Sequence, residues 1–529
     1  MTTTGSSIGG RVRTRAAAVD RVAFVVLAGG FVVSRLAAHL AGVRYDASLL
    51  AVSLQHLDPG LLEDRLIESL WFQHTQPPLF NLLIGLVLKL SPISPERTFH
   101  LLWLLLGLVL VAVTYRLLIG LRVGRVPALV ATLIITCSPT VILYESWLSY
   151  EYPLTVAITA IALASIRWVR TGGLRWLMAI ALLAAGCVLT RALLNPLWFV
   201  GVLAVVIVAR RPVGRWRPAL LAIGIPTLVI VALMAKNQVL FGSPSFSSWL
   251  GWNLQRVTID ELPTETRQRL VDEGVLTPLA TYPVFLPTDT YADVVAPCER
   301  EYPDIPVLAD PTKPTTGREN FNDECFLPIY RESLDNALAA GWAEPGSAAR
   351  AVFGSMQIWS ESSSQYAFVY DNRLKIDGAD TVYRQIVLLD VPYDPPVRTN
   401  AGWWIPIGTP GGRWRFSITV IVATAIAAVA GIRGVVRVAR RSATATDAAL
   451  AVIGITVVSV TVVGNLFEIG ENNRFRFMVE PITFVALTWF LTRVGARLVA
   501  WWRARGSHEP AASPEEPAPT PARVGGSAP

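Results

Sequence analysis

Long apolar runs alternate with short polar segments along most of this chain, and many of the polar segments contain several arginines. A bilayer core takes a helix of about 17–25 apolar residues, so runs of this length predict membrane-spanning helices. The first such run covers residues 22–43. The others cover 99–121, 127–144, 153–169, 174–190, 193–209, 218–235, 414–432, 447–464 and 478–499. This pattern predicts an all-α polytopic membrane protein.

The apolar run at 79–90, LFNLLIGLVLKL, differs from the others in length. Runs of roughly 10–14 residues are more often interfacial or re-entrant than membrane-spanning. If this run does not cross, every arginine-rich segment falls on the same side as the basic N-terminus, as the positive-inside rule requires. Those segments are 122–125, 167–175, 210–217, 433–441 and 497–505. We therefore expect ten spans, both termini in the cytoplasm, and interfacial helices in the first outer loop.

The same pattern divides the chain into parts with different environments. They are a disordered cytoplasmic start at 1–21, a membrane core at 22–235 with an outer loop at 44–98, an extracytoplasmic loop domain at 236–413, C-terminal spans at 414–500, and a disordered cytoplasmic tail at 501–529. Within the long loop domain, helices are expected near 330–341 and 344–359. No strand alternation long enough for a β-domain is present in the sequence.

Composition and charge narrow the class further. Hydrophobic residues make up 52% of the chain and charged residues 16%, and the formal net charge is +7. The arginines lie in loops between apolar runs, which indicates membrane orientation and no nucleic-acid partner. Lysine is nearly absent while alanine and valine are abundant, a bias typical of a GC-rich bacterial genome. We therefore expect a multi-pass protein of the bacterial plasma membrane.

The four cysteines fall into two groups. Cys137 and Cys187 sit in apolar runs, where a free cysteine is a small packing residue. Cys298 and Cys325 share the long polar loop, and outside the cytoplasm they could be either bonded or free. No cysteine and histidine spacing of a zinc site is present, and no glycine pattern of a nucleotide-binding loop.

Acidic side chains gather on the predicted outer face, where arginine is scarce. Asp46 lies three residues beyond the first apolar run, and Glu145 and Glu151 stand at the outer ends of the third and fourth. A carboxylate at the boundary of water and lipid is partly desolvated, which suits a general base. The alternative for each is a solvated residue that ends a helix. Glu471, in the last outer loop, is a further candidate for substrate binding.

The segment His-Thr-Gln-Pro-Pro at 74–78 precedes the short apolar run. Two prolines fix an extended approach and cannot lie inside a helix, so the helix begins there. His74 and Gln76 would then be held rigidly at the interface, where they could bind substrate. The alternative is a purely structural turn.

Arginines on the outer face need a reason for their position. Arg474 and Arg476 lie two residues apart in the segment ENNRFRF, and Arg191 follows the fifth span. A guanidinium binds phosphate through two hydrogen bonds and keeps its charge near lipid. We expect these three to bind the phosphate of a lipid substrate, with attraction to lipid head groups as the alternative. Arg35, within the first span, is assigned no role.

The order of these features resembles the GT-C glycosyltransferases, and within them the protein O-mannosyltransferase and aminoarabinose-transferase branch. The resemblance covers mainly 22–200 and 464–490, and it includes the acid after the first span and the Gln-Pro-Pro-Leu-Phe helix start. It implies a GT-C-like helix bundle, a polyprenyl-phosphate-sugar donor, Asp46 as base, and Arg474 and Arg476 on the leaving phosphate.

Two departures from that branch leave questions open. Ala47 stands where a second acid usually follows the first. In the second outer loop, Glu-Tyr-Pro at 151–153 replaces the usual Asp-Pro pair. The choice between Glu145 and Glu151 as the second acid therefore stays open, and so does any requirement for a divalent metal.

The sequence thus predicts an inverting glycosyltransferase that moves a sugar from a polyprenyl-phosphate carrier to a cell-envelope glycan, lipid or protein at the outer face of the membrane. Two other functions remain as alternatives. One is a transporter or flippase of lipid-linked sugars, although such proteins favour charges near the midplane and paired repeats. The other is a catalytically inactive scaffold for envelope assembly.

Overall fold

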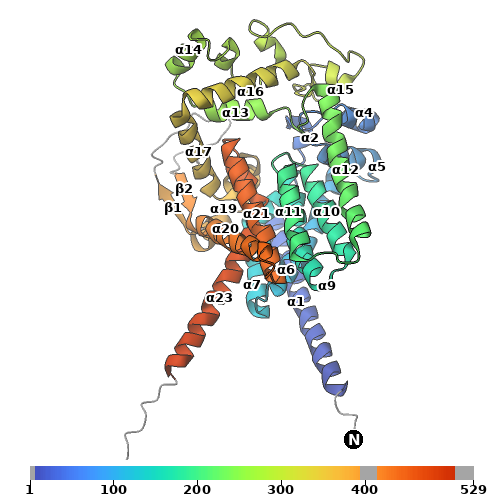
Figure 1. Cartoon of the computed structure of the whole chain (residues 1–529), viewed down its shortest axis with the longest axis vertical. Helices are drawn as coiled ribbons and strands as arrows, with labels where there is room; N and C mark the ends of the chain where they lie inside the picture. Colours follow the sequence, from blue (N-terminus) through green and yellow to red (C-terminus); the bar gives the residue numbers. More distant parts are fainter. Residues whose placement is uncertain (1–5, 394–413, 507–529) are drawn as a thin grey trace, which may run out of the picture.

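The computed structural model describes residues 6–393 and 414–506, and it is an all-α membrane protein over that part of the chain (Figure 1). Within these described residues, seven helices are long and apolar enough to cross a membrane. They are α1 (Ser6–Leu40), α6 (Pro95–Gly120), α9 (Glu151–Thr171), α12 (Trp216–Phe241), α20 (Ile418–Ala439), α21 (Ala445–Leu466) and α23 (Glu480–Gly506).

An eighth span would be formed by two shorter helices together, α7 (Arg125–Thr136) and α8 (Pro139–Glu145), which meet at a bend of 53°. The sequence predicts one continuous run here. The bend follows from Pro139, which lacks a backbone N–H and disfavours helical geometry in the residue before it. Ser138 caps the new helix by accepting a hydrogen bond from the Val141 N–H.

Three further apolar helices of the described chain are shorter: α5 (Leu79–Leu90), α10 (Leu174–Val188) and α11 (Pro196–Ala209). α10 packs against α9 and α12, and α11 packs against α21, so both belong to the bundle. If both crossed, the count would reach the predicted ten, which remains a prediction. α5 lies instead against α3 (Pro59–Asp64) and α4 (Leu66–Trp71) of the first loop.

The ends of the described chain are more helical than the sequence suggests. α1 already begins at Ser6, inside the start predicted to be disordered, and α23 continues to Gly506. Alanine and arginine favour helix, so each span extends beyond its apolar part. In Figure 1 both helices project from the end of the bundle opposite the cap.

The part we name the cap, residues 242–393, covers the other end of the bundle with its first helices and then descends along one side of it to the paired strands (Figure 1). Its larger helices are α13 (Leu250–Thr258), α14 (Thr264–Asp272), α16 (Phe326–Ala343) and α17 (Pro345–Ser360). α16 and α17 confirm the two helices expected in the long loop. α13 packs closely on α16 because Gly251 has no Cβ to collide with the Tyr330 backbone oxygen.

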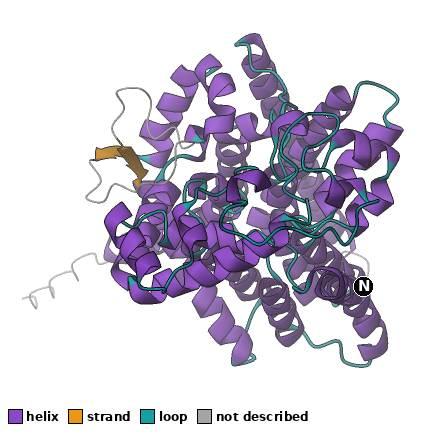
Figure 2. Ribbon diagram, turned by 90° about the horizontal axis from the view of Figure 1, so that it is seen from above, coloured by secondary structure: helices purple, strands orange, loops and turns teal. Residues whose placement is uncertain are grey.

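Besides five short helical turns between 278 and 388, the described chain has several further short elements. They are α2 (Leu49–Val52), α15 (Pro306–Ala309), α18 (Tyr370–Lys375), α19 (Asp377–Tyr383), α22 (Asn472–Phe477), and the antiparallel strands β1 (Asp390–Tyr393) and β2 (Trp414–Ser417). Seen from above, the two strands lie at one edge of the helices (Figure 2). This pairing is too small to form a domain.

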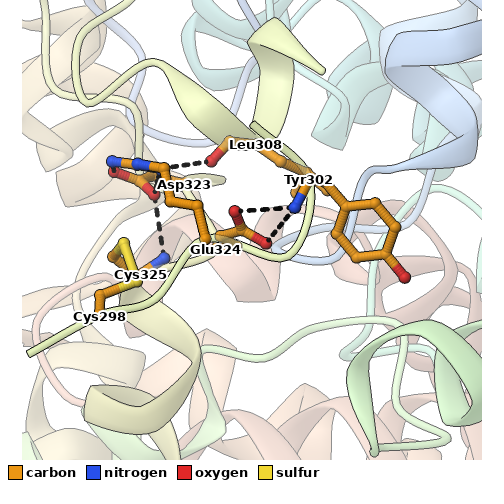
Figure 3. Close-up of a disulfide and its surroundings, with 7 residues drawn as sticks. Cys298, Tyr302, Leu308, Asp323, Glu324 and Cys325 are labelled. Atoms are coloured by element: carbon orange, nitrogen blue, oxygen red, sulfur yellow. Dashed lines mark hydrogen bonds and ion pairs between the residues drawn. A yellow bond between two sulfur atoms is a disulfide. The ribbon is translucent and has the colours of Figure 1, made fainter. Parts of the chain in front are cut away.

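A disulfide joins Cys298 to Cys325, so the bonded alternative holds for this pair (Figure 3). Beside it, Arg300 forms an ion pair of 2.6 Å with Asp323, and Glu324 accepts a hydrogen bond from the Tyr302 N–H. These contacts attach the segment before α15 to the start of α16. Cys187 is buried as expected, whereas Cys137 is only half-buried.

Candidate functional site

A cavity of about 360 Å³ lies where the cap meets the helix bundle. The segments that line it are far apart in sequence. They are 49–56 of the first loop, 147–151, 191–195, 245–256 of the cap and 463–475, together with Gln76, Phe285 and Phe368. The lining combines arginines and carboxylates with a larger number of apolar and aromatic side chains, which is the composition expected of a ligand site.

Glu151 is the most deeply buried carboxylate of this cavity among the described residues, with 0% of its surface exposed. It is the first residue of α9, where the helix dipole favours a negative charge. One of its oxygens, Oε1, lies 3.1 Å from Nε of Arg474. Its other oxygen has no hydrogen-bond partner among the described residues. Glu151 can therefore still accept a proton or a hydrogen bond from a ligand.

Arg474, by contrast, is fully committed to its neighbours. Its Nη2 lies 2.7 Å from Oε2 of Glu471, and the hydroxyls of Tyr150 and Tyr366 accept further hydrogen bonds. Burial alone would raise the pKa of Glu471. The charge of Arg474 and the hydrogen bond from the Tyr366 hydroxyl lower it by more, so the pKa lies below its usual range. The Glu471 carboxylate thus stays charged and holds Arg474 in place as part of the wall.

Arg191 is different, because no carboxylate lies within ion-pair distance of it in the described chain. It sits between α10 and α11 and is 9% exposed. Its Nη1 donates a hydrogen bond of 3.2 Å to Gln55, and its guanidinium lies 4.9 Å from the centre of the Tyr150 ring. The other cavity arginine outside α22, Arg256, lies 2.5 Å from Glu468. Arg191 is therefore the lining arginine without a direct ion pair, although the cavity as a whole is lined by three arginines and three glutamates.

Asp46 does not line this cavity. Its backbone pairs with the second loop, donating to the Ser146 oxygen and accepting from the Leu148 N–H, both at 2.8 Å. Its Oδ1 accepts a hydrogen bond of 2.8 Å from the Ser48 N–H, as a short acidic side chain does in a turn. Asp46 thus joins two loops beside Trp147, which does line the cavity.

Glu145 also lies outside the cavity. Its carboxylate is held by Arg35 at 2.8 Å and by the Tyr152 hydroxyl at 2.5 Å. Gly107 leaves the room for this, since a Cβ there would collide with the carboxylate. Of the two glutamates that the sequence left open, the structure brings only Glu151 to the cavity.

Arg476 is separated from Arg474 by helix geometry. The segment forms α22, and residues two apart on a helix point to different sides. Arg476 donates to the Ser363 hydroxyl at 2.8 Å and lies 3.3 Å from Glu480, away from the cavity lining. The helical geometry of α22 therefore does not favour the expectation that both arginines bind one phosphate.

The two polar residues of the 74–78 turn have different places. Gln76 lines the cavity, and its side chain makes no hydrogen bond with a described residue. His74 is buried and bonded to the Ser248 hydroxyl at 2.9 Å and to the Asn322 backbone oxygen at 3.0 Å. Burial lowers the pKa of His74 to about 3, so the ring is neutral. The structural alternative therefore fits His74, whereas Gln76 can meet a ligand.

The sequence analysis did not single out several of the residues that line the cavity. Glu468 could have been found, because it lies three residues before Glu471 in the same polar loop. Gln55, His56, Tyr150, Asn253 and Arg256 gave no local signal, since their proximity depends on how distant segments pack. Among the described residues, no three histidine, cysteine or acidic side chains are grouped as a metal site would require.

Comparison of the chain with protein-family models, with curated proteins and with solved structures found no match. The resemblance to GT-C enzymes accordingly rests on the residues quoted above. The chemistry of the cavity supplies the further argument.

Proposed function

We propose that this protein transfers a sugar from a polyprenyl-phosphate carrier to an acceptor hydroxyl inside the cavity between bundle and cap. One observation supports this above the others. Arg191, which forms no direct ion pair, and the carboxylate Glu151, with its unused oxygen, line the same cavity of about 360 Å³. Such a cavity offers a place for a phosphate and a place for the proton that the reaction releases.

Arg191 suits the phosphate of the donor. Guanidinium groups bind phosphate with two parallel hydrogen bonds, and a fixed positive charge is most effective where water is excluded. In the reaction, the bond between the anomeric carbon and the phosphate oxygen breaks, and negative charge develops on that oxygen. Arg191 would stabilise the departing polyprenyl phosphate. Arg474 contributes through position only, because its charge is already matched.

Glu151 suits the acceptor side of the same step. As the acceptor oxygen forms its bond to the anomeric carbon, its proton passes to the free oxygen of Glu151. Attack from the face opposite the phosphate inverts the anomeric configuration. The resemblance implies that Asp46 has this role, whereas the geometry favours Glu151. The two assignments predict opposite effects on sugar transfer when either residue is substituted.

The carrier also fits its surroundings. The cavity is bounded partly by apolar residues next to spans, such as Leu193 before α11 and Val463 and Phe467 at the end of α21. A polyprenyl chain could remain in the lipid while its phosphate enters. With the arginine-rich segments in the cytoplasm, this face is the outer face of a bacterial plasma membrane.

The transporter alternative has less support. The charged residues of the cavity lie at helix ends, with Glu151 starting α9 and Arg191 following α10, rather than near the middle of spans. Transport sites are usually built near the midplane from broken helices. An inactive scaffold would bind the donor without turning it over, which the same experiment distinguishes.

The test uses purified protein in liposomes with radiolabelled polyprenyl-phosphate sugars and extracted envelope acceptors. We expect sugar transfer by the wild type, weaker donor binding with Arg191→Gln, and partial recovery with Arg191→Lys, which keeps the charge. The control is Arg269→Gln, at an exposed arginine of α14. If the wild type neither binds polyprenyl phosphate nor transfers sugar, the proposal is wrong; binding without transfer would identify the scaffold.

A further inference from the structure

Two carboxamide side chains in the cavity lining have no hydrogen-bond partner among the described residues. Asn253 on α13 and Gln76 from the first loop both line the cavity and are half-buried. Neither side chain makes a hydrogen bond with another described residue. A carboxamide offers two N–H donors and one acceptor oxygen, so it can satisfy neighbouring hydroxyl groups in either sense. Two such groups with nothing to bind indicate a ligand with several hydroxyls.

Aromatic rings line the same cavity as these carboxamides. Trp249 and Phe285 meet edge to face with ring centres 5.4 Å apart, and Trp147 and Phe368 are stacked at 6.0 Å. All four line the cavity. Trp249 donates its ring N–H to the Tyr330 hydroxyl, which fixes the indole. Rigid apolar surfaces next to amides match a sugar ring, whose C–H faces are apolar and whose edge carries hydroxyls.

The charges of the lining residues distinguish between the candidate acceptors. Among the lining residues that the structure describes, Arg191 is the cation without a carboxylate partner, and the donor phosphate needs it. Arg256, on the cap side, is neutralised by Glu468 at 2.5 Å. An acceptor with a phosphate of its own would therefore face a wall without a free positive charge.

The lining also lacks the features that usually bind a peptide acceptor. Extended peptides usually bind by pairing their backbone with an exposed strand or by placing a helix in an apolar groove. The cap contributes α13, the segment 245–249 before it, and Phe285 and Phe368, and none of these is an exposed strand. The strands β1 and β2 do not line the cavity.

We propose that the acceptor is a neutral glycan, held against the cap by Asn253 and Gln76 and packed on the surrounding aromatic rings. This inference rests on the proposed sugar transfer, and it chooses one of the three acceptor classes that the sequence left open. It makes Asn253 and Gln76 determinants of acceptor specificity, separate from Arg191 on the donor side.

The test measures binding to the full-length protein by saturation-transfer-difference NMR and calorimetry. The probes are short neutral oligosaccharides of gluco, manno, galacto and arabino configuration, a serine-containing peptide, and polyprenyl phosphate. At least one oligosaccharide should bind, and Asn253→Ala and Gln76→Ala should each weaken it about tenfold, as expected for a lost hydrogen bond. Polyprenyl phosphate should bind these variants as it binds the wild type.

Two further variants sharpen the result. Asn253→Asp keeps the shape of the side chain but removes its donors, so it should weaken the oligosaccharide while the fold is kept. Gln268→Ala removes an exposed carboxamide on α14 and should change nothing. Binding of the peptide but of no oligosaccharide would overturn the inference and leave the proposed transfer intact. Failure of polyprenyl phosphate to bind the wild type would instead contradict the proposed function itself.

Discussion

The guanidinium of Arg35, within α1, forms two hydrogen bonds of 2.8 Å with the carboxylate of Glu145 at the end of α8. Both side chains are largely buried, with 11% and 3% of their surfaces exposed. Arg35 also donates to the Thr136 backbone oxygen, where α7 ends. The pair therefore ties the first span to the bend between α7 and α8. A residue without an assigned role thus explains why a candidate catalytic acid is structural.

We expect the loss of either partner to destabilise the protein strongly. Glu145→Leu or Arg35→Leu leaves a buried charge unpaired, which costs about 3–5 kcal/mol. The double substitution removes both charges and should recover a large part of that loss. The measurement is a double-mutant cycle on the thermal unfolding midpoint in detergent. Purely additive losses would show that the two residues are not coupled.

Glu151 and Asp46 should differ sharply in sugar transfer. If Glu151 accepts the acceptor proton, Glu151→Gln should lower kcat by roughly 10²–10⁴-fold. Asp46→Asn should reduce it only mildly, because Asp46 acts on the arrangement of two loops. Initial rates with labelled donor would decide between them, with donor binding as a check that each variant is folded. A large loss with Asp46→Asn and an active Glu151→Gln would return the role of base to Asp46.

The disulfide should contribute measurably to stability. Cys298 and Cys325 are 27 residues apart, and closing a loop of that size stabilises a fold by about 3.5 kcal/mol. Reductant, or the double substitution Cys298→Ser and Cys325→Ser, should lower the unfolding midpoint. The double variant provides its own control, since reductant should not change its midpoint further. A wild type that is indifferent to reductant would contradict this expectation.

Acidification should destabilise the fold through buried neutral histidines. Burial lowers the pKa of His74 to about 3 from its ordinary 6.5, and that of His56 in the same way. The unfolded chain then binds more protons below pH 6.5, so this stability is present above that pH and is lost as the pH falls. For each pH unit below that value, each of the two histidines lowers the free energy of unfolding by up to about 1.4 kcal/mol.

The measurement is the unfolding midpoint from about pH 7.5 to about pH 5. His74→Gln should be less stable at the higher pH but should lose less on acidification. The control is His39→Gln, at an exposed histidine, which should follow the wild type. Parallel curves for wild type and His74→Gln would exclude His74 as a source of the acid sensitivity.

The class of the protein and much of its layout could be predicted from the chain alone. Apolar length selects membrane helices because lipid cannot satisfy exposed backbone groups, and this holds whatever the helices pack against. The same local physics identified α16 and α17 and set the short α5 apart. It also directed attention to the segments at 145–151 and 464–477, which both reach the cavity.

The roles of individual residues were decided only by tertiary structure. Asp46 and Glu151 look alike in sequence, but strand-like pairing with 146–148 engages Asp46, whereas Glu151 starts a helix at the cavity. Arg474 and Arg476 were separated by the phase of a short helix that the sequence did not show. Asn253 became a candidate only because the cap lies over the bundle. Hydrophobicity acts locally along a chain, whereas the pairing of charges and amides depends on distant segments meeting.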